Sequence, residues 1–400
     1  MAILSLFLIL LLAAAMIAVL IWLDFRLGKK NVVKKELDEP AIYTGEASLI
    51  TTGTEFFDTL FEEIEQAAHH LHIQFYIFNE DCIGKEMTSL LKRKAREGVK
   101  VRLLVDYLGS FFLKKKAIHE MKLAGVQFAY SFKPGFPYFF YKLNRRNHRK
   151  ITIIDGKKGF TGGFNVGDEY LGRDPKLGDW RDYHLQLHGP VVHAFQEQFL
   201  LDWEAASGEK LSGDSYFPAL DEGTQTFTSL FSTKQIYLFF LQQIEQAKTK
   251  IFIGSPYFIP DAKLQNALLD ALKRGVEVTL LVPMKSDHPL VKEASYPFIR
   301  ELLKSGGHVY QYYEGFFHAK VFMADENICD IGTANFDLRS LFTNSEVNCV
   351  FTDQKLIRSA LKTIEDDLAR SVIMDVSALD KPSLWTKIKM QTAKSFAPFL

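Results

Sequence analysis

The chain has 400 residues, and its 48 Lys and Arg side chains balance 48 Asp and Glu side chains, so its formal net charge is zero. This length accommodates two or three domains with buried cores. The 47% apolar and 24% charged composition excludes a mainly disordered chain. The neutral balance disfavours a dedicated nucleic-acid-binding protein, and three scattered cysteines are too few for a disulfide framework or a Cys-rich zinc site.

The chain begins with a long apolar run, residues 3–23, that carries no charged side chain. As a helix rising about 1.5 Å per residue it would span roughly 31 Å, enough to cross a bilayer core. A cleaved signal peptide is the alternative, but it would place basic residues before a shorter apolar run. Here they follow it, at Arg26, Lys29, Lys30, Lys34 and Lys35. We therefore predict an uncleaved, single-pass anchor in the cell membrane, with the rest of the chain in the cytoplasm.

The remainder of the chain repeats itself. Residues 64–67 (IEQA) recur at 244–247, and the strand-like run 97–105 recurs at 274–282, each time after a basic amphipathic helix pattern. An internal repeat of this length indicates two similar lobes. Because helix and strand patterns alternate, we predict α/β lobes in which mixed sheets are flanked by helices.

The repeat and the composition set the expected boundaries. A segment rich in Ser, Gly, Asp and Glu lies between the copies and predicts a linker. The expected organisation is a transmembrane anchor at 1–23, a basic juxtamembrane segment at 24–45, a first lobe at 46–205, a linker at 206–225, a second lobe at 226–372 and a basic amphipathic tail at 373–400.

Each copy carries one polar signature with the pattern HxKxxxxD, followed by glycine and then asparagine. The members are His148, Lys150, Asp155 and Asn165 in the first copy, and His318, Lys320, Asp325 and Asn335 in the second. Corresponding members are 170 residues apart in all four cases. A single HxKxxxxD pattern arises easily by chance, whereas its recurrence in register with a downstream asparagine does not.

The spacing of the signature has a physical meaning. His and Lys two positions apart on a strand project from the same face, and a glycine-containing turn brings the asparagine back beside them. Lys and Asn side chains bind phosphoryl oxygens, and a neutral imidazole serves as nucleophile or general acid/base near neutral pH. Two copies supply one histidine for each side of a phosphorus centre. The alternative, polar residues with a purely structural role at strand ends, suits a lone histidine better than a repeated set.

The two acidic residues of the signature are the exception. Asp155 and Asp325 count with the signature as catalytic candidates, but both lie beyond the strand. Their position favours a supporting role as loop or salt-bridge anchors.

The doubled signature resembles the phospholipase D superfamily, and the flanking sequence from about Glu46 to Leu400 is similar to its bacterial cardiolipin synthase branch. The resemblance rests on residues 146–150 (RNHRK), 180–182 (WRD), 255–261 (SPYFIPD), 332–340 (GTANFDLRS) and 344–346 (NSE). It implies two phospholipase D-type lobes with the active site at their interface. The single anchor departs from the two membrane helices with which members of this branch usually begin.

The resemblance also implies roles for individual residues. His148 and His318 would face each other, one forming a phosphohistidine and the other protonating the leaving alcohol, with family precedent for His148 as the nucleophile. Asp182 and Glu346 would orient the histidines. The phosphate would be held by Lys150, Lys320, Asn165, Asn335 and Thr333. Gly163 stands where the first copy would carry a small hydroxyl residue, so one phosphate donor would be missing there. No metal or other cofactor is implied.

The implied reaction is a reversible phosphatidyl transfer between two phosphatidylglycerol molecules, giving cardiolipin and glycerol. The expected partners are anionic phospholipid and the membrane, with no nucleic acid. Three alternatives stay open: a phospholipase D that releases phosphatidic acid, a membrane-tethered nuclease and an inactive lipid-binding scaffold.

Two further segments bear on membrane binding. The run Phe132–Lys142 is aromatic and bracketed by lysines, so it predicts either a lip at the bilayer surface or a core loop. The tail Lys381–Leu400 is basic and apolar, and it predicts either membrane contact or a helix packed on the second lobe.

Overall fold

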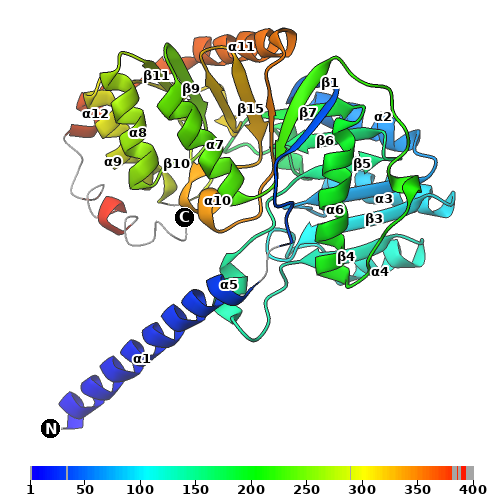
Figure 1. The fold of residues 1–400 in the computed structure, drawn as a ribbon. Coiled ribbons are helices and arrows are strands. Elements are labelled where there is room, and N and C mark those ends of the chain that lie inside the picture. The colour runs from blue at the N-terminus through cyan, green and yellow to red at the C-terminus, as the bar shows by residue number, and fades with distance from the viewer. Residues whose placement is uncertain (1, 33–34, 289, 381–384, 386–388, 393–400) are drawn as a thin grey trace.

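A single exposed helix, α1 (Ala2–Asn31), extends away from a body of two lobes (Figure 1). The structure is a computed structural model that describes residues 2–32, 35–288, 290–380, 385 and 389–392. The Leu4–Asn31 part of α1 has a mean hydropathy of 3.1 over its most apolar stretch, which is not buried against the body, and it is long enough to cross a membrane. The helix thus continues past the predicted end of the anchor at residue 23.

The first lobe alternates strands and helices, as the repeat predicts. Its elements are β1 (Ala41–Thr52), α2 (Gly53–Glu65), β2 (His70–Phe75), α3 (Cys82–Arg96), β3 (Lys100–Asp106), α4 (Lys115–Leu123), β4 (Gln127–Ser131), α5 (Phe139–Asn144), β5 (Ile151–Ile154), β6 (Lys158–Gly162), β7 (Trp180–His188) and α6 (Val191–Ser207), with a short 3-10 helix at Asp168–Leu171.

The second lobe repeats this order with small insertions. Its elements are β8 (Gln225–Leu230), α7 (Thr233–Gln246), β9 (Lys250–Gly254), β10 (Phe258–Ile259), α8 (Ala262–Lys273), β11 (Glu277–Pro283), α9 (Val291–Lys304), β12 (His308–Tyr312), β13 (Phe316–Phe317), β14 (Val321–Ala324), β15 (Ile328–Gly332), β16 (Phe336–Asp337), α10 (Leu338–Phe342), β17 (Asn348–Phe351), α11 (Gln354–Ala369), β18 (Ser371–Ile373) and α12 (Ser377–Asp380).

The two lobes share one continuous mixed sheet. The first lobe has the strand order β1-β7-β6-β5-β2-β3-β4, and the second has the matching order β8-β17-β15-β14-β9-β11-β12. The lobes join through β1, whose residues 41–45 pair with β8 while residues 46–52 pair with β7. The predicted start of the first lobe at residue 46 is thus the point at which β1 changes partner.

The internal repeat is also visible in how the helices begin. Thr52 and Ser232 cap α2 and α7, and Asp81 and Asp261 cap α3 and α8, each by accepting a backbone N–H of the first turn. Both pairs of caps are 180 residues apart. The same local signals therefore start the same helices in both lobes.

Helices cover both faces of the sheet, and the hydrophobic core is continuous between the lobes. A large buried cluster combines α6 and α11 side chains, such as Phe199 and Ile357, with strand residues of both lobes, such as Leu185 and Ile331. Each lobe has in addition its own cluster under its remaining helices. This shared core fixes how the two copies of the signature face each other.

The predicted linker packs on the first lobe. It contains a short 3-10 helix, Asp214–Tyr216, whose Tyr216 side chain is buried against the rings of His70 and His72. Gly223 approaches the backbone of Gly45 so closely that a Cβ would lie 2.1 Å from it. The connection between the lobes is therefore an ordered part of the body.

The aromatic run that precedes the first signature divides between both predicted roles. Phe136 is 88% exposed, whereas Tyr141 on α5 is buried. Tyr141 packs beneath α1, since a Cβ on Gly28 would lie 2.5 Å from its ring, and its backbone N–H donates to Asp24 Oδ2 at 2.8 Å. One part of the run thus holds the end of the anchor helix, and the other part is exposed beside it.

Much of the predicted tail, and Lys34 of the juxtamembrane segment, lie outside the described residues. Within the described part of the tail, Trp385 is 67% exposed. Lys389 Nζ lies 3.0 Å from Glu293 Oε1 on α9, so this portion contacts the second lobe.

Candidate active site

The two signatures meet at the junction of the lobes, where each borrows a backbone partner from the other lobe. The His148 N–H donates to the carbonyl of Ser345 at 2.8 Å, and the His318 N–H donates to the carbonyl of Arg181 at 2.7 Å. The segment before His318 also forms the short strand β13, which pairs in parallel with the start of β7. These contacts place each histidine beside the acidic residue that follows the opposite signature.

The carboxylates consequently cross over between the lobes. His148 Nδ1 lies 2.8 Å from Glu346 Oε2, and His318 Nδ1 lies 2.6 Å from Asp182 Oδ2. Both carboxylates are fully buried. Since each carboxylate accepts the Nδ1–H, it fixes the ring and directs Nε2 away from the partner.

The lysines of the signature lie close to their histidines. Lys150 Nζ donates to the backbone carbonyl of His148 at 2.9 Å and lies 5.5 Å from the centre of the Tyr76 ring. Lys320 Nζ lies against the His318 ring, 3.0 Å from Nε2, and 3.8 Å from Asp182 Oδ2. The site therefore concentrates two ammonium groups around two imidazoles.

This environment keeps both histidines neutral at pH 7. Burial lowers the pKa of His148 to about 4, a shift that Glu346 opposes and Lys150 reinforces. Burial, reinforced by Lys320, likewise lowers the pKa of His318 to about 4 although Asp182 opposes the shift. A neutral imidazole with Nδ1–H engaged presents an unprotonated Nε2, the form required of a nucleophile.

The charges of the other groups follow from the same burial. Desolvation lowers the pKa of Lys150 to about 7 and that of Lys320 to about 8. Burial alone would raise the pKa of Asp182, but Lys320 and His318 outweigh it and the pKa lies below its usual value. His148 and Lys150 have the same effect on Glu346. Both carboxylates therefore remain ionised.

The two asparagines line the same cleft in different states. Asn165 is held in place, since its Oδ1 accepts from the Ile77 N–H at 3.1 Å and its Nδ2 donates to the Tyr170 hydroxyl at 2.9 Å. Asn335 is also buried, but its Oδ1 has no hydrogen-bond partner among the described residues.

Thr333 occupies a different role from the predicted one. Its hydroxyl donates to Glu346 Oε2 at 2.6 Å and accepts the N–H of Val347 at 2.9 Å, with the side chain fully buried. The hydroxyl is thus committed to the carboxylate that orients His148. Its assignment as a phosphate ligand is wrong, and Thr333 is a positioning residue.

The glycine in the first copy has its own reason. A Cβ on Gly163 would lie 1.7 Å from Asp182 Oδ1, so only glycine leaves room for this carboxylate. Trp180 Nε1 donates to Asp182 Oδ2 at 3.3 Å, and the Tyr183 N–H donates to Asp182 Oδ1 at 2.9 Å. The first lobe therefore lacks no phosphate donor at this position, because the corresponding threonine of the second lobe is not one.

Asp155 and Asp325 lie at the far ends of β5 and β14, in turns with positive φ. Asp155 accepts the backbone N–H groups of residues 68–70 at 2.8 Å each. Asp325 accepts those of residues 248–250 at 2.7–3.2 Å. They tie each signature hairpin to the start of β2 or β9, so their inclusion among the catalytic residues is corrected to the anchoring role.

Two aromatic contacts were not predicted. Tyr76 sets its ring edge-on to His148 with 4.9 Å between centroids, and Trp180 packs on His318 at the same separation. Tyr76 directly follows β2, just as Tyr257 follows β9 in the second lobe. Comparison of the two repeats at this position was the available sequence signal.

A cleft of about 570 Å³ runs between the lobes, and both histidines and both asparagines line it. Arginines lie toward the His148 end, whereas acidic residues, Tyr257 and Trp180 lie toward the His318 end. Further lining residues are Arg146, Arg339, Glu169, Asp174 and Asp287. Among the described residues, no group of three or more His, Cys, Asp or Glu side chains is arranged to hold a metal ion.

The doubled α/β lobe with a His–Lys pair from each copy on one cleft defines the phospholipase D fold. Residues 60–180 and 240–368 match the family described as "Cardiolipin synthase, PLD-like domain", and the chain belongs to this family.

Curated relatives match most of the chain. "Minor cardiolipin synthase ClsB" of Bacillus subtilis (strain 168) is 41% identical over 381 residues, which cover 94% of each protein. "Major cardiolipin synthase ClsA" of the same organism is 40% identical over 374 residues, covering 91% of this chain and 78% of that protein. Among solved structures, a phosphatidylserine synthase of Haemophilus influenzae has the same fold, with a TM-score of 0.72 at 15% identity over 91% of this chain and 98% of that one.

Proposed function

We propose that the protein is a membrane-anchored cardiolipin synthase that transfers a phosphatidyl group between two phosphatidylglycerol molecules. Family membership and the cardiolipin synthases at 40–41% identity support the reaction class. The observation that carries the chemistry is the pair of histidines, each oriented through Nδ1 by a buried carboxylate of the other lobe, on a single cleft.

The first step is attack by His148 Nε2 on the phosphorus of the donor lipid. The new N–P bond replaces the P–O bond to the glycerol headgroup, which leaves from the opposite side, toward His318. His318 must be protonated to give this alcohol its proton. An anionic phosphate bound between the lysines favours the charged form of nearby groups, so binding of the donor raises the pKa of His318 and supplies the acid when it is needed.

The second step reverses the first with a new alcohol. His318, now neutral, accepts the proton of a glycerol hydroxyl from the second phosphatidylglycerol, and that oxygen displaces His148 from phosphorus. One phosphodiester replaces another, so the reaction needs no nucleotide and runs in both directions. Lys150, Lys320, Asn165 and Asn335 stabilise the charge that develops on the phosphoryl oxygens.

The position of the cleft favours a lipid substrate. The end of α1 is held against α5 by Asp24 and Gly28, and α5 leads directly into the first signature. We infer that α1 crosses the membrane once with the body on the cytoplasmic side, as the basic residues after the apolar run indicate. Exposed rings of the aromatic run, above all Phe136, would then lie at the bilayer surface.

Purified full-length protein with phosphatidylglycerol vesicles tests this function. The expected products are cardiolipin and free glycerol in equal amounts, with cardiolipin formation abolished in His148→Ala and His318→Ala. Phosphatidic acid as the dominant product, with cardiolipin absent, would replace the proposal with a hydrolase. Nicking of plasmid DNA that depends on His148 would point to a nuclease instead.

A further inference from the structure

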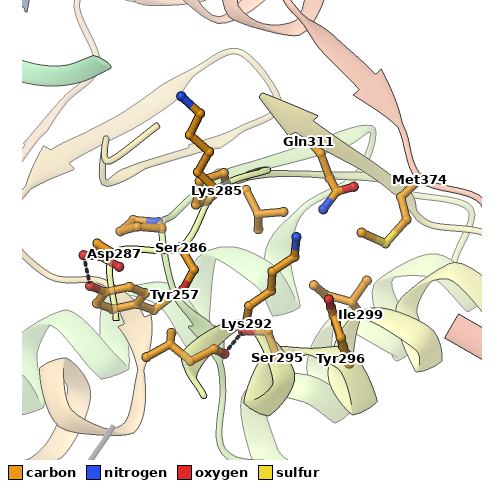
Figure 2. Close-up of a pocket in the computed structure, with 14 residues that line it drawn as sticks. Tyr257, Lys285, Ser286, Asp287, Lys292, Ser295, Tyr296, Ile299, Gln311 and Met374 are labelled. Atoms are coloured by element: carbon orange, nitrogen blue, oxygen red, sulfur yellow. Dashed lines mark hydrogen bonds between the residues drawn. The ribbon is translucent and has the colours of Figure 1, made fainter. Parts of the chain in front are cut away.

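A second, smaller pocket lies beside the cleft in the second lobe (Figure 2). Its walls come from the end of β11, the start of α9 and the segment after β9. Tyr257, Asp287 and Val291 line both the pocket and the cleft. The two spaces are therefore neighbours that share one wall, on the side of the cleft that holds His318.

Two lysines border this pocket without a partner of opposite charge. Lys292 Nζ donates to the carbonyl of Met284 at 2.8 Å, and Lys285 Nζ donates to the carbonyl of Leu177 at 2.6 Å. Among the described residues, neither ammonium has a carboxylate within 4.0 Å. In Figure 2 the Lys292 ammonium lies between the side chains of Lys285 and Gln311.

The surroundings of Lys292 make an anionic ligand favourable. The side chain is partly buried, and burial lowers the pKa of its ammonium. Val282, Ile299 and Met374 add apolar surface to the same pocket. A charge withdrawn from water without a counter-ion is costly, and an anion bound here would offset that cost while receiving charge-assisted hydrogen bonds.

We infer that this pocket binds the phosphate of the second, acceptor lipid. The inference rests on the proposed function, in which the attacking hydroxyl belongs to phosphatidylglycerol. That hydroxyl is separated from the acceptor's own phosphate by the three carbons of one glycerol unit. When the hydroxyl reaches the phosphorus beside His318, the acceptor phosphate must lie in an adjoining space, and the Lys285–Lys292 pocket is such a space.

The shared wall suits the glycerol unit that would cross it. Tyr257 donates its hydroxyl to Asp287 Oδ2 at 2.5 Å. Asp287 lies close enough to His318 and Lys320 to raise the pKa of each, against the larger opposing effect of burial. A carboxylate at this point accepts a hydrogen bond from the central hydroxyl of the glycerol unit and separates the two phosphates of the product.

This arrangement would distinguish a lipid acceptor from water or free glycerol. Water and glycerol reach the phosphohistidine without using the pocket, whereas phosphatidylglycerol gains the binding energy of its phosphate. The pocket would thus direct the enzyme toward transfer rather than hydrolysis.

The test compares acceptors in wild type, Lys292→Met and Lys292→Arg, with Lys263→Met as the matched control because Lys263 is an exposed lysine of α8 in the same lobe. Two reactions are measured on phosphatidylglycerol vesicles: cardiolipin formation, and exchange of labelled glycerol into phosphatidylglycerol. Loss of a charge-assisted contact predicts a fall in cardiolipin formation of about tenfold or more in Lys292→Met. Glycerol exchange should stay within about twofold, and Lys292→Arg and Lys263→Met should resemble wild type.

A soluble pair of acceptors separates phosphate recognition from recognition of the lipid chains. Wild type should prefer glycerol phosphate to glycerol, and Lys292→Met should lose this preference. Equal loss of cardiolipin formation and glycerol exchange in Lys292→Met would overturn the inference, as would unchanged cardiolipin formation or an unaltered preference for glycerol phosphate. Failure of the proposed function is distinguishable, because wild type itself would then form no cardiolipin.

Discussion

Glu346 Oε2 lies 2.8 Å from Nδ1 of His148, although the two residues are 198 positions apart and belong to different lobes. Asp182 makes the reciprocal contact with His318 at 2.6 Å. Each signature therefore depends on the opposite lobe for the orientation of its histidine. Neither copy of the repeat forms a complete site, which explains why the lobes share a continuous core instead of being joined by a flexible tether.

This dependence predicts a large loss of activity from Glu346→Gln. The substitution keeps the size of the side chain but removes the charge that fixes the Nδ1–H tautomer of His148, so cardiolipin formation should fall roughly 100-fold or more. Glu326→Gln is the matched control, since Glu326 is an exposed residue of the same lobe paired with Lys250. Activity of Glu346→Gln close to that of the control would show that the cross-lobe contact is dispensable.

Gly163→Ala tests the reason for glycine in the first copy. The new methyl group would overlap Asp182 Oδ1, which is fully buried and has no space to retreat. We expect a loss of about 1–3 kcal/mol in the free energy of unfolding, together with reduced transfer as His318 loses its alignment.

The control for this substitution is Gly159→Ala on the same strand, β6, where the nearest atoms to a new Cβ lie at 3.5 Å. Thermal unfolding and cardiolipin formation should be close to wild type in that variant. Equal behaviour of the two variants would refute the proposed contact between position 163 and Asp182.

The pKa values predict the pH dependence of kcat/KM for the first step, which reports groups of the free enzyme. His148 has a pKa lowered to about 4, so its nucleophilic neutral form is lost only as pH falls toward 4. Lys150 has a pKa lowered to about 7, so its phosphate-binding charge is lost as pH rises through that value. A profile with limbs near these two values is expected, and Lys150→Arg should move the alkaline limb upward. An acid limb near pH 6.5 would contradict the buried, neutral state of His148.

The exposed aromatic residue Phe136 predicts contact with the bilayer. Phe136→Cys in a Cys82→Ser background, which removes the exposed cysteine and leaves the buried Cys329 and Cys349, allows labelling with an environment-sensitive dye. Its emission should shift to the blue on phosphatidylglycerol vesicles. Leu123→Cys, equally exposed at the opposite end of β4, provides the comparison and should show no shift. Equal shifts at both positions would exclude a specific lip.

The sequence allowed the repeat, the α/β class and the facing His–Lys pairs to be predicted, because these depend on local periodicity and on a constant offset of 170 residues. Asp182 and Glu346 could be singled out in the same way. Which histidine each carboxylate serves could not, since that contact joins segments 136 and 198 residues apart and is set by how the lobes pack.

The mistaken role of Thr333 has a similar origin. In a linear sequence a hydroxyl next to the signature is equivalent to a phosphate ligand, and only the packed structure shows that Glu346 already occupies it. Gly163 was interpreted as a missing donor for the same reason. The divided pairing of β1, which joins the two half-sheets, likewise has no local pattern that announces it.

The most direct test of the mechanism is to locate the covalent intermediate. Wild-type protein is mixed with phosphatidylglycerol, quenched in alkali within a single turnover and mapped by mass spectrometry of its peptides. The account predicts a phosphatidyl group on the imidazole of His148, its absence in His148→Ala, and its loss when a second phosphatidylglycerol is supplied in excess. A phosphatidyl group on His318, or single-turnover cardiolipin formation with neither histidine modified, would contradict it.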